Sequence, residues 1–154
     1  MRKVFLNAIR FLELVKEEMK DRYQLLGCCG IFCGTDCEVY EAAHSNDIEV
    51  KRRVAKALER DLGIKISPSS LRCEGCQGPE ENMWFECRLC RIRQCGKKQG
   101  IKLCIECQDY PCRIMELWLS KSQSAPKNLP EISELGLDQW IEKKLEKVGC
   151  NVNV

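Results

Sequence analysis

Thirteen cysteines in a chain of 154 residues restrict the folds open to this sequence more than any other feature. Such a density is typical of a disulfide scaffold, a metal-binding protein or a thiol oxidoreductase. Residues 73–112 alone hold eight of the cysteines and few other large apolar side chains. Because so little apolar surface cannot offset the entropy lost on ordering, we expect metal–thiolate bonds to hold this segment together.

The sequence predicts a cytoplasmic protein, in which thiols stay reduced and clustered cysteines usually bind metal. The chain begins Met1-Arg2-Lys3, but Arg10 and Glu13 interrupt the apolar stretch that follows, which argues against a signal peptide. No apolar run is long enough to span a bilayer, so no membrane is expected as a partner. The 25 basic and 23 acidic residues nearly balance and give no global reason to expect nucleic acid.

Three Cys-x-x-Cys pairs stand out in the sequence: Cys73/Cys76, Cys87/Cys90 and Cys104/Cys107. Two intervening residues let both sulfur atoms reach one ion, and two such pairs make the tetrahedral four-sulfur shell that zinc prefers. The spacing leaves an interleaved pairing open. The two predicted metal-ligand sets are Cys73, Cys76, Cys87 and Cys90, and Cys95, Cys104, Cys107 and Cys112.

A third group of candidate metal ligands comes earlier in the chain and consists of Cys29, Cys33 and Cys37. Its fourth ligand is left open between Cys28, His44 and a cysteine from the later segment, although Cys28 is so close to Cys29 that it would join with difficulty. A closed shell would be structural, whereas three ligands and an open position would make a reactive site.

Two or three zinc ions are the predicted cofactors, and an iron–sulfur cluster is the alternative because four thiolates hold either metal. The ferredoxin run of cysteines is absent. No strand pattern flanks any Cys-x-x-Cys pair, as a thioredoxin-like oxidoreductase would require. We therefore predict a metal-binding protein with no assigned catalytic residues, and an iron–sulfur or open-zinc enzyme as the alternative.

A basic segment lies between Glu86 and Glu106, which have no acidic residue between them. Its cations can offset the negative charge of zinc-bound thiolates or simply be solvated. The second alternative function, a nucleic-acid-binding zinc adaptor, would require all six on one exposed face. They are Arg88, Arg91, Arg93, Lys97, Lys98 and Lys102.

We expect residues 1–27 to form an amphipathic helix, because apolar residues recur at steps of three and four over residues 3–26. This helix is a candidate binding element for a protein partner. Residues 28–148 are predicted to be the cysteine-rich metal-binding domain, and residues 149–154 a disordered tail in which Cys150 is a free thiol.

The predicted fold class is a small α-rich, metal-stapled domain, with about five helices around an irregular cysteine-rich core and little strand. Asn46 and Glu49 resemble a capping box that opens a helix ending near Leu62. Further helices are predicted over residues 112–121 and 138–148. A loop is predicted at residues 64–72, and a linker at residues 122–130 because it contains two prolines.

The order of these motifs resembles an uncharacterised prokaryotic family of cysteine-rich proteins that is catalogued as a domain of unknown function. The resemblance covers roughly residues 28–148 and implies metal binding, with zinc as the expected metal, but no reaction. The family usually has two residues between its second and third cysteines, where this chain has three. The motifs are Cys29-Gly30-Ile31-Phe32-Cys33 with Cys37 and Tyr40, Cys73-Glu74-Gly75-Cys76, Cys87-Arg88-Leu89-Cys90-Arg91-Ile92-Arg93-Gln94-Cys95, Cys104-Ile105-Glu106-Cys107-Gln108-Asp109-Tyr110-Pro111-Cys112, and Leu135-Gly136-Leu137-Asp138-Gln139-Trp140-Ile141.

Overall fold

The structure is a computed structural model that describes residues 22–151, with side chains for residues 22–148. Most of the predicted helix over residues 3–26 lies outside the described residues, and so do the side chain of Cys150 and residues 152–154 of the predicted tail. The predicted domain boundaries stay predictions.

Short helices joined by irregular segments make up the described chain, which forms no strand and has one isolated antiparallel bridge, between Leu26 and Phe32. The prediction of a small α-rich fold is therefore confirmed. The helices outnumber the expected five because short helices form between the cysteines. The elements are α2 (Cys33–Asp36), α3 (Glu38–His44), α4 (Ile48–Leu62), η1 (Pro68–Ser70), η2 (Glu80–Asn82), α5 (Phe85–Leu89), α6 (Arg91–Gln99), η3 (Cys104–Glu106), α7 (Arg113–Lys121), α8 (Ala125–Leu135) and α9 (Leu137–Asn151).

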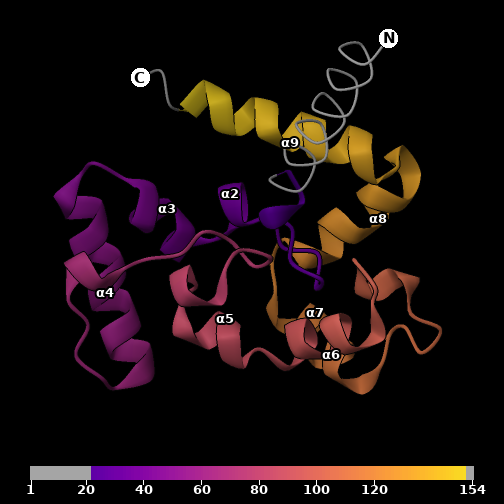
Figure 1. Ribbon diagram of the computed structural model, residues 1–154, viewed down its shortest axis with the longest axis horizontal. Coiled ribbons are helices and arrows are strands. Elements are labelled where there is room, and N and C mark those ends of the chain that lie inside the picture. Colours follow the sequence, from indigo (N-terminus) through magenta and orange to yellow (C-terminus); the bar gives the residue numbers. More distant parts are fainter. Residues whose placement is uncertain (1–21, 152–154) are drawn as a thin grey trace, which may run out of the picture.

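The first cysteine segment passes through the middle of the molecule, where it is drawn in indigo (Figure 1). Helices α3 and α4 lie to the left of it, α5, α6 and α7 lie below it, α9 runs above it and α8 lies at the upper right (Figure 1). Helix α2 packs against α9, α3 against α4, and α8 against α9.

The larger of two apolar clusters, the Trp140 cluster, joins the first cysteine segment to α7, α8 and α9. The ring of Phe32 meets that of Trp140 edge to face, with centroids 5.7 Å apart. The cluster also contains three cysteines. Its buried members are Leu26, Cys28, Cys29, Phe32, Ile92, Leu103, Cys104, Met115, Leu129, Ile132, Trp140 and Ile141.

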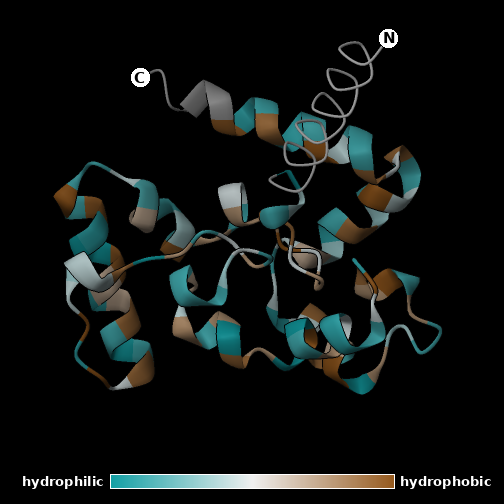
Figure 2. Ribbon diagram, in the orientation of Figure 1, coloured by the Kyte–Doolittle hydropathy of each residue, from teal (hydrophilic) through white to brown (hydrophobic). Residues whose placement is uncertain are grey.

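The smaller apolar cluster, the Val54 cluster, lies between α3, α4 and the chain that leads into α5. Brown apolar residues on α4 face this interior, and teal polar residues cover its outer side (Figure 2). The side chains in this cluster are mostly smaller than those of the Trp140 cluster. Its buried members are Val39, Ala42, Val54, Ala55, Ile66, Leu71, Cys73 and Trp84.

Helix α4 confirms the helix predicted to end near Leu62, but its cap differs from the expected one. The side chain of Asp47, not of Asn46, accepts the N–H of Glu49 at 2.8 Å. Gly63 ends the helix with a φ of 66°, in the left-handed region that favours glycine.

The linker predicted at residues 122–130 is wrong, because α8 begins at Ala125. Pro126 falls in the first turn of the helix, where a missing N–H costs nothing. Pro130 lies inside the helix and does remove one hydrogen bond. Burial of Leu129 and Ile132 in the Trp140 cluster offsets that loss.

Candidate metal centre

A tight turn over residues 27–30 presents two consecutive cysteines to the interior. The N–H of Gly27 donates to the carbonyl of Ile31 at 2.7 Å, and the N–H of Gly30 donates to the carbonyl of Gly27 at 2.9 Å. Gly30 has a φ of 89°, which favours glycine. Both Cys28 and Cys29 are buried as a result.

Four thiols from three segments are neighbours in a row and form what we call the Cys76 group: Cys33, Cys73, Cys76 and Cys87. The thiol of Cys73 hydrogen-bonds to Cys87. That of Cys76 hydrogen-bonds to both Cys87 and Cys33. Cys37 lies beside the group, close enough to Cys73 for their charges to interact. The group therefore joins the first cysteine segment to two of the predicted Cys-x-x-Cys pairs.

Thiol–thiol hydrogen bonds and burial favour the neutral form of this group. The bond to Cys87, followed by burial, raises the pKa of Cys73, and the bond to Cys33 raises the pKa of Cys76. The bond from Cys73 lowers the pKa of Cys87, but the bond to Cys76 and burial outweigh it and raise that pKa to about 12. A ligand that replaces these protons must therefore bind sulfur strongly.

Backbone N–H groups donate to three of the sulfur atoms, and each such bond lowers the pKa of its cysteine. Other effects outweigh these bonds and raise each of the three pKa values. For Cys73 the main cause is the hydrogen bond to Cys87. For Cys37 and Cys29 the main cause is burial, which raises the pKa of Cys29 to about 11. The donor–sulfur pairs are Gly75 and Trp84 with Cys73, Val39 and Tyr40 with Cys37, and Ile31 with Cys29.

A second set of thiols, the Cys28 group, belongs to the Trp140 cluster and consists of Cys28, Cys29, Cys90 and Cys104. The Sγ atoms of Cys28 and Cys104 are 3.4 Å apart. The hydrogen bond between the two thiols raises the pKa of Cys104 and lowers that of Cys28. Cys29 interacts electrostatically with Cys90 and Cys28, and Cys104 interacts with Cys112.

Two glycines allow the sulfur atoms to approach the backbone closely. A Cβ added at Gly96 would lie 2.5 Å from the Sγ of Cys28, so only glycine fits there. A Cβ added at Gly27 would lie 3.2 Å from the Sγ of Cys29 and 3.5 Å from the Sγ of Cys76. The sulfur atoms of Cys29 and Cys76 therefore lie around one point, where the two groups adjoin.

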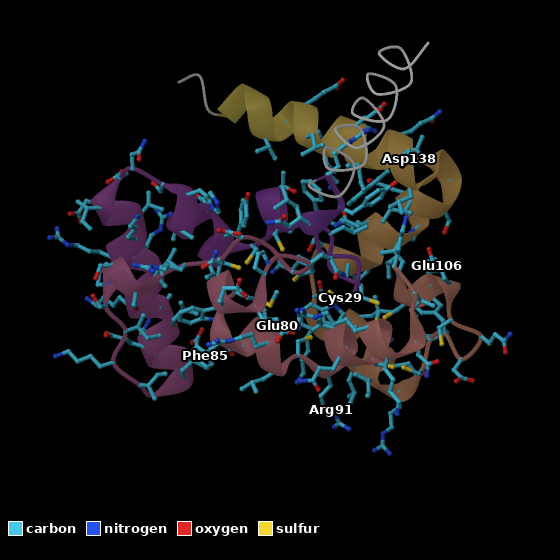
Figure 3. The ribbon with its side chains drawn as sticks, viewed as in Figure 1. Cys29, Glu80, Phe85, Arg91, Glu106 and Asp138 are labelled. Carbon is cyan, nitrogen blue, oxygen red and sulfur yellow. The ribbon has the colours of Figure 1, made fainter. Side chains whose placement is uncertain are left out.

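A cavity of about 200 Å³ lies between the two thiol groups. Cys29 is labelled near the middle of the molecule in Figure 3, with several yellow sulfur atoms around it. Trp118 also lines the cavity, and its buried Nε1 has no hydrogen-bond acceptor among the described residues. The cysteines that line the cavity are Cys28, Cys29, Cys33, Cys37, Cys76, Cys87 and Cys90.

Arg93 is 5% exposed and lines the same cavity. Its Nε donates to the carbonyl of Cys76 at 2.9 Å, and its terminal nitrogens donate to Glu80 at 3.2 Å. The ammonium of Lys97 also donates to Glu80, and these bonds from Lys97 and Arg93 lower the pKa of Glu80. Because Arg93 is buried, the six predicted cations do not share one exposed face, as a nucleic-acid adaptor would require.

The structure interleaves the predicted ligand sets. Cys33 from the third group of candidate ligands joins Cys73, Cys76 and Cys87, while Cys90 lies close to Cys29. No three cysteine, histidine or acidic side chains among the described residues are placed so that they could hold a metal ion between them.

The four cysteines of the second predicted set differ in their exposure to solvent. Cys104 is buried against Cys28, Cys107 is half-buried, and Cys95 and Cys112 are exposed. His44, a candidate fourth ligand, is exposed and stacks on Tyr40 with ring centroids 4.1 Å apart. The proximity of Cys28 to Cys104, the close approach at Gly96 and the unpartnered Nε1 of Trp118 were not found from the sequence, because none has a local motif.

In the part of the chain that the structure describes, no helix is both long and apolar enough to cross a membrane. The fold and the buried thiols define a small, helical, cysteine-rich protein. Residues 25–117, more than half of the chain, match the family described as "Protein of unknown function (DUF3795)". The chain belongs to this family, as its cysteine motifs suggested. No curated protein and no solved structure matches the chain.

Proposed function

We propose that the chain is a metal-binding protein in which cysteine thiolates hold two or three zinc ions, and that these ions fix its fold. The observation that carries the proposal is the Cys76 group, in which four cysteines from three segments are neighbours in a row at the edge of the Val54 cluster. Four thiolates are the ligands of a closed structural zinc site. We propose no catalysed reaction.

The surroundings of the sulfur atoms fit thiolate ligands. Zinc binding would replace the thiol protons and leave a four-thiolate shell with a net charge of −2. The backbone N–H groups directed at Cys73, Cys37 and Cys29 would donate to thiolates better than to neutral thiols. Arg93, at the cavity wall, brings a positive charge close to that shell.

The proposed shell requires movement of side chains. With Zn–S bonds of about 2.3 Å, neighbouring sulfur atoms in a tetrahedral shell are about 3.8 Å apart. The thiols of the Cys76 group already contact each other in the order Cys73, Cys87, Cys76, Cys33. Rotation about the side-chain bonds would turn this chain of contacts into a tetrahedron, so binding would couple local rearrangement to proton release.

Metal analysis of the full chain, purified without oxygen, tests the proposal. We expect two or three zinc ions per chain, and loss of one of them in Cys76→Ser. The matched control is Cys95→Ser, because Cys95 is exposed and lies outside both thiol groups. Stoichiometric iron together with inorganic sulfide would contradict the zinc assignment and indicate an iron–sulfur cluster instead. If the purified chain contains no metal, the proposal is wrong, and the Cys76 group consists of free thiols that only pack in the interior.

A further inference from the structure

The unpartnered indole nitrogen of Trp118 indicates that something in the cavity accepts a hydrogen bond. Trp118 lies on α7 and packs against the Trp140 cluster, as Cys90 does. A buried N–H without an acceptor costs about 1–3 kcal/mol, and such groups are rare in folded proteins. The other two tryptophans have acceptors, since Trp84 donates to Glu86 and Trp140 donates to Glu131, each at 3.0 Å.

Water is a poor candidate for this acceptor. An ordered water needs two to four polar partners to hold it in place. The cavity wall is made mainly of apolar and thiol groups, with Asp36 and Arg93 as its charged residues. Arg93 is already paired with Glu80, and Asp36 accepts from Asn128 and from the N–H of Phe32.

Sulfur atoms are the remaining polar side-chain groups at the wall, and their charge decides whether they accept a hydrogen bond. A neutral thiol is a weak acceptor, whereas a metal-bound thiolate accepts N–H donors well. Trp118 belongs to the same apolar cluster as the Cys28 group, whose members come from the turn at 27–30, the end of α5 and η3. Backbone contact holds this group together, because the N–H of Cys104 donates to the carbonyl of Cys28 at 2.8 Å.

We propose that Cys28, Cys29, Cys90 and Cys104 bind a second metal ion beside the cavity, and that Trp118 Nε1 donates a hydrogen bond to one of its thiolate ligands. This inference rests on the proposed function and assigns the place of one further ion. Four protons leave the thiols for solvent as the ion binds. Cys28 and Cys29 are adjacent in sequence, yet both line the cavity, because the turn at 27–30 directs them inward.

The site also explains two features of the structure near Cys28. The Sγ atoms of Cys28 and Cys104, 3.4 Å apart, need to separate only slightly to become neighbouring ligands of one ion. Gly96 leaves room for the Sγ of Cys28, which any larger residue would displace. Trp118 is a positioning residue here, because it would act through a ligand and not on the metal directly.

Cobalt titration of the full-length, metal-free chain under reducing conditions tests the two sites separately. We expect two cobalt ions per chain, one in Cys76→Ser and one in Cys104→Ser, since these cysteines belong to different groups. If the chain binds one ion that is lost in Cys76→Ser and kept in Cys104→Ser, the inference is wrong, whereas the metal site proposed at the Cys76 group stands. If the chain binds no cobalt, both fail.

Trp118→Phe removes the N–H donor and keeps an aromatic ring, and Trp140→Phe is the matched control. We expect Trp118→Phe to shift the sulfur-to-cobalt charge-transfer band of the second site and to weaken its affinity by about 10–100-fold. Trp140→Phe should leave that band in place, because Trp140 donates to Glu131. An unchanged band and affinity in Trp118→Phe would overturn the role of Trp118, even if its stability falls.

Discussion

The two halves of the molecule bury very different amounts of apolar volume. The largest fully buried side chains all belong to the Trp140 cluster: Trp140, Phe32, Leu26, Leu103, Met115, Leu129 and Ile141. In the Val54 cluster no side chain is as large and as completely buried, and Ala42 and Ala55 are among its members. We infer that apolar burial can hold together the half around the Trp140 cluster. The half around the Val54 cluster depends instead on metal–thiolate bonds at the Cys76 group.

The largest expected effect comes from Cys76→Ser. Loss of a structural zinc site removes binding free energy on the order of 10 kcal/mol, so the chain around residues 73–87 should unfold locally. The Trp140 cluster should persist. Limited proteolysis of the full chain should give cuts within residues 73–87 and leave α8 and α9 intact. Equal protection in the variant and the wild type would contradict the role of the metal.

Trp140→Ala weakens the apolar cluster and leaves the metal ligands of the Cys76 group unchanged. It removes a fully buried indole and should lower the free energy of unfolding by about 3–5 kcal/mol, measured by chemical denaturation. Zinc at the Cys76 group should remain bound, because Trp140 lies outside the Val54 cluster. Release of that zinc by the substitution would show that the two halves fold as one cooperative unit.

Gly96→Ala tests the close approach within the Cys28 group. The added Cβ would meet the Sγ of Cys28 at 2.5 Å, and such overpacking costs about 1–3 kcal/mol. We expect lower stability by chemical denaturation and weaker binding of the second ion. Lys98→Ala on the exposed side of the same helix is the control. Gly96→Ala with wild-type stability would mean that the two segments separate easily.

The pH dependence of the metal-free chain should follow the buried thiols. Burial raises the pKa of Cys29 to about 11, from its ordinary value of 9.0. A raised pKa stabilises the folded state fully below about pH 9, and this contribution is lost as the pH rises toward about 11. Denaturation at several pH values should show this decline, with a shallower slope in Cys29→Ala. The metal-bound chain should instead lose stability in acid, as protons displace the metal.

Asp47→Ala should have the smallest effect of this series. Its carboxylate caps α4 by accepting the N–H of Glu49, and loss of such a cap costs about 1 kcal/mol. Asn46→Ala should change the free energy of unfolding by less, since Asn46 does not cap the helix. Chemical denaturation of the two variants distinguishes them, and a larger effect at Asn46 would contradict this assignment.

The sequence predicted the elements whose signals are local. Helix α4 follows from its periodicity and from Gly63, and the α-rich class follows from the lack of strand patterns. The linker prediction failed at α8 because tertiary packing of Leu129 and Ile132 outweighs the effect of Pro130. A proline in the sequence indicates only the hydrogen bond lost within its own helix, and not the packing that can offset this loss.

The grouping of the cysteines could not be predicted from their spacing. Cys87 and Cys90 look like one ligand pair, yet they lie in different groups, because Cys90 at the end of α5 turns toward Cys29. The contact between Cys28 and Cys104 spans 76 residues of sequence. Such contacts depend on how the two apolar clusters pack, which no motif records.

Hydrogen exchange measured by mass spectrometry, before and after metal removal under reducing conditions, tests the central claim most directly. The account predicts that residues 73–87 lose their protection when the metal is removed, while α8 and α9 keep most of theirs. Unchanged protection of residues 73–87 after verified metal removal would contradict it, and would show that packing alone holds the Cys76 group together.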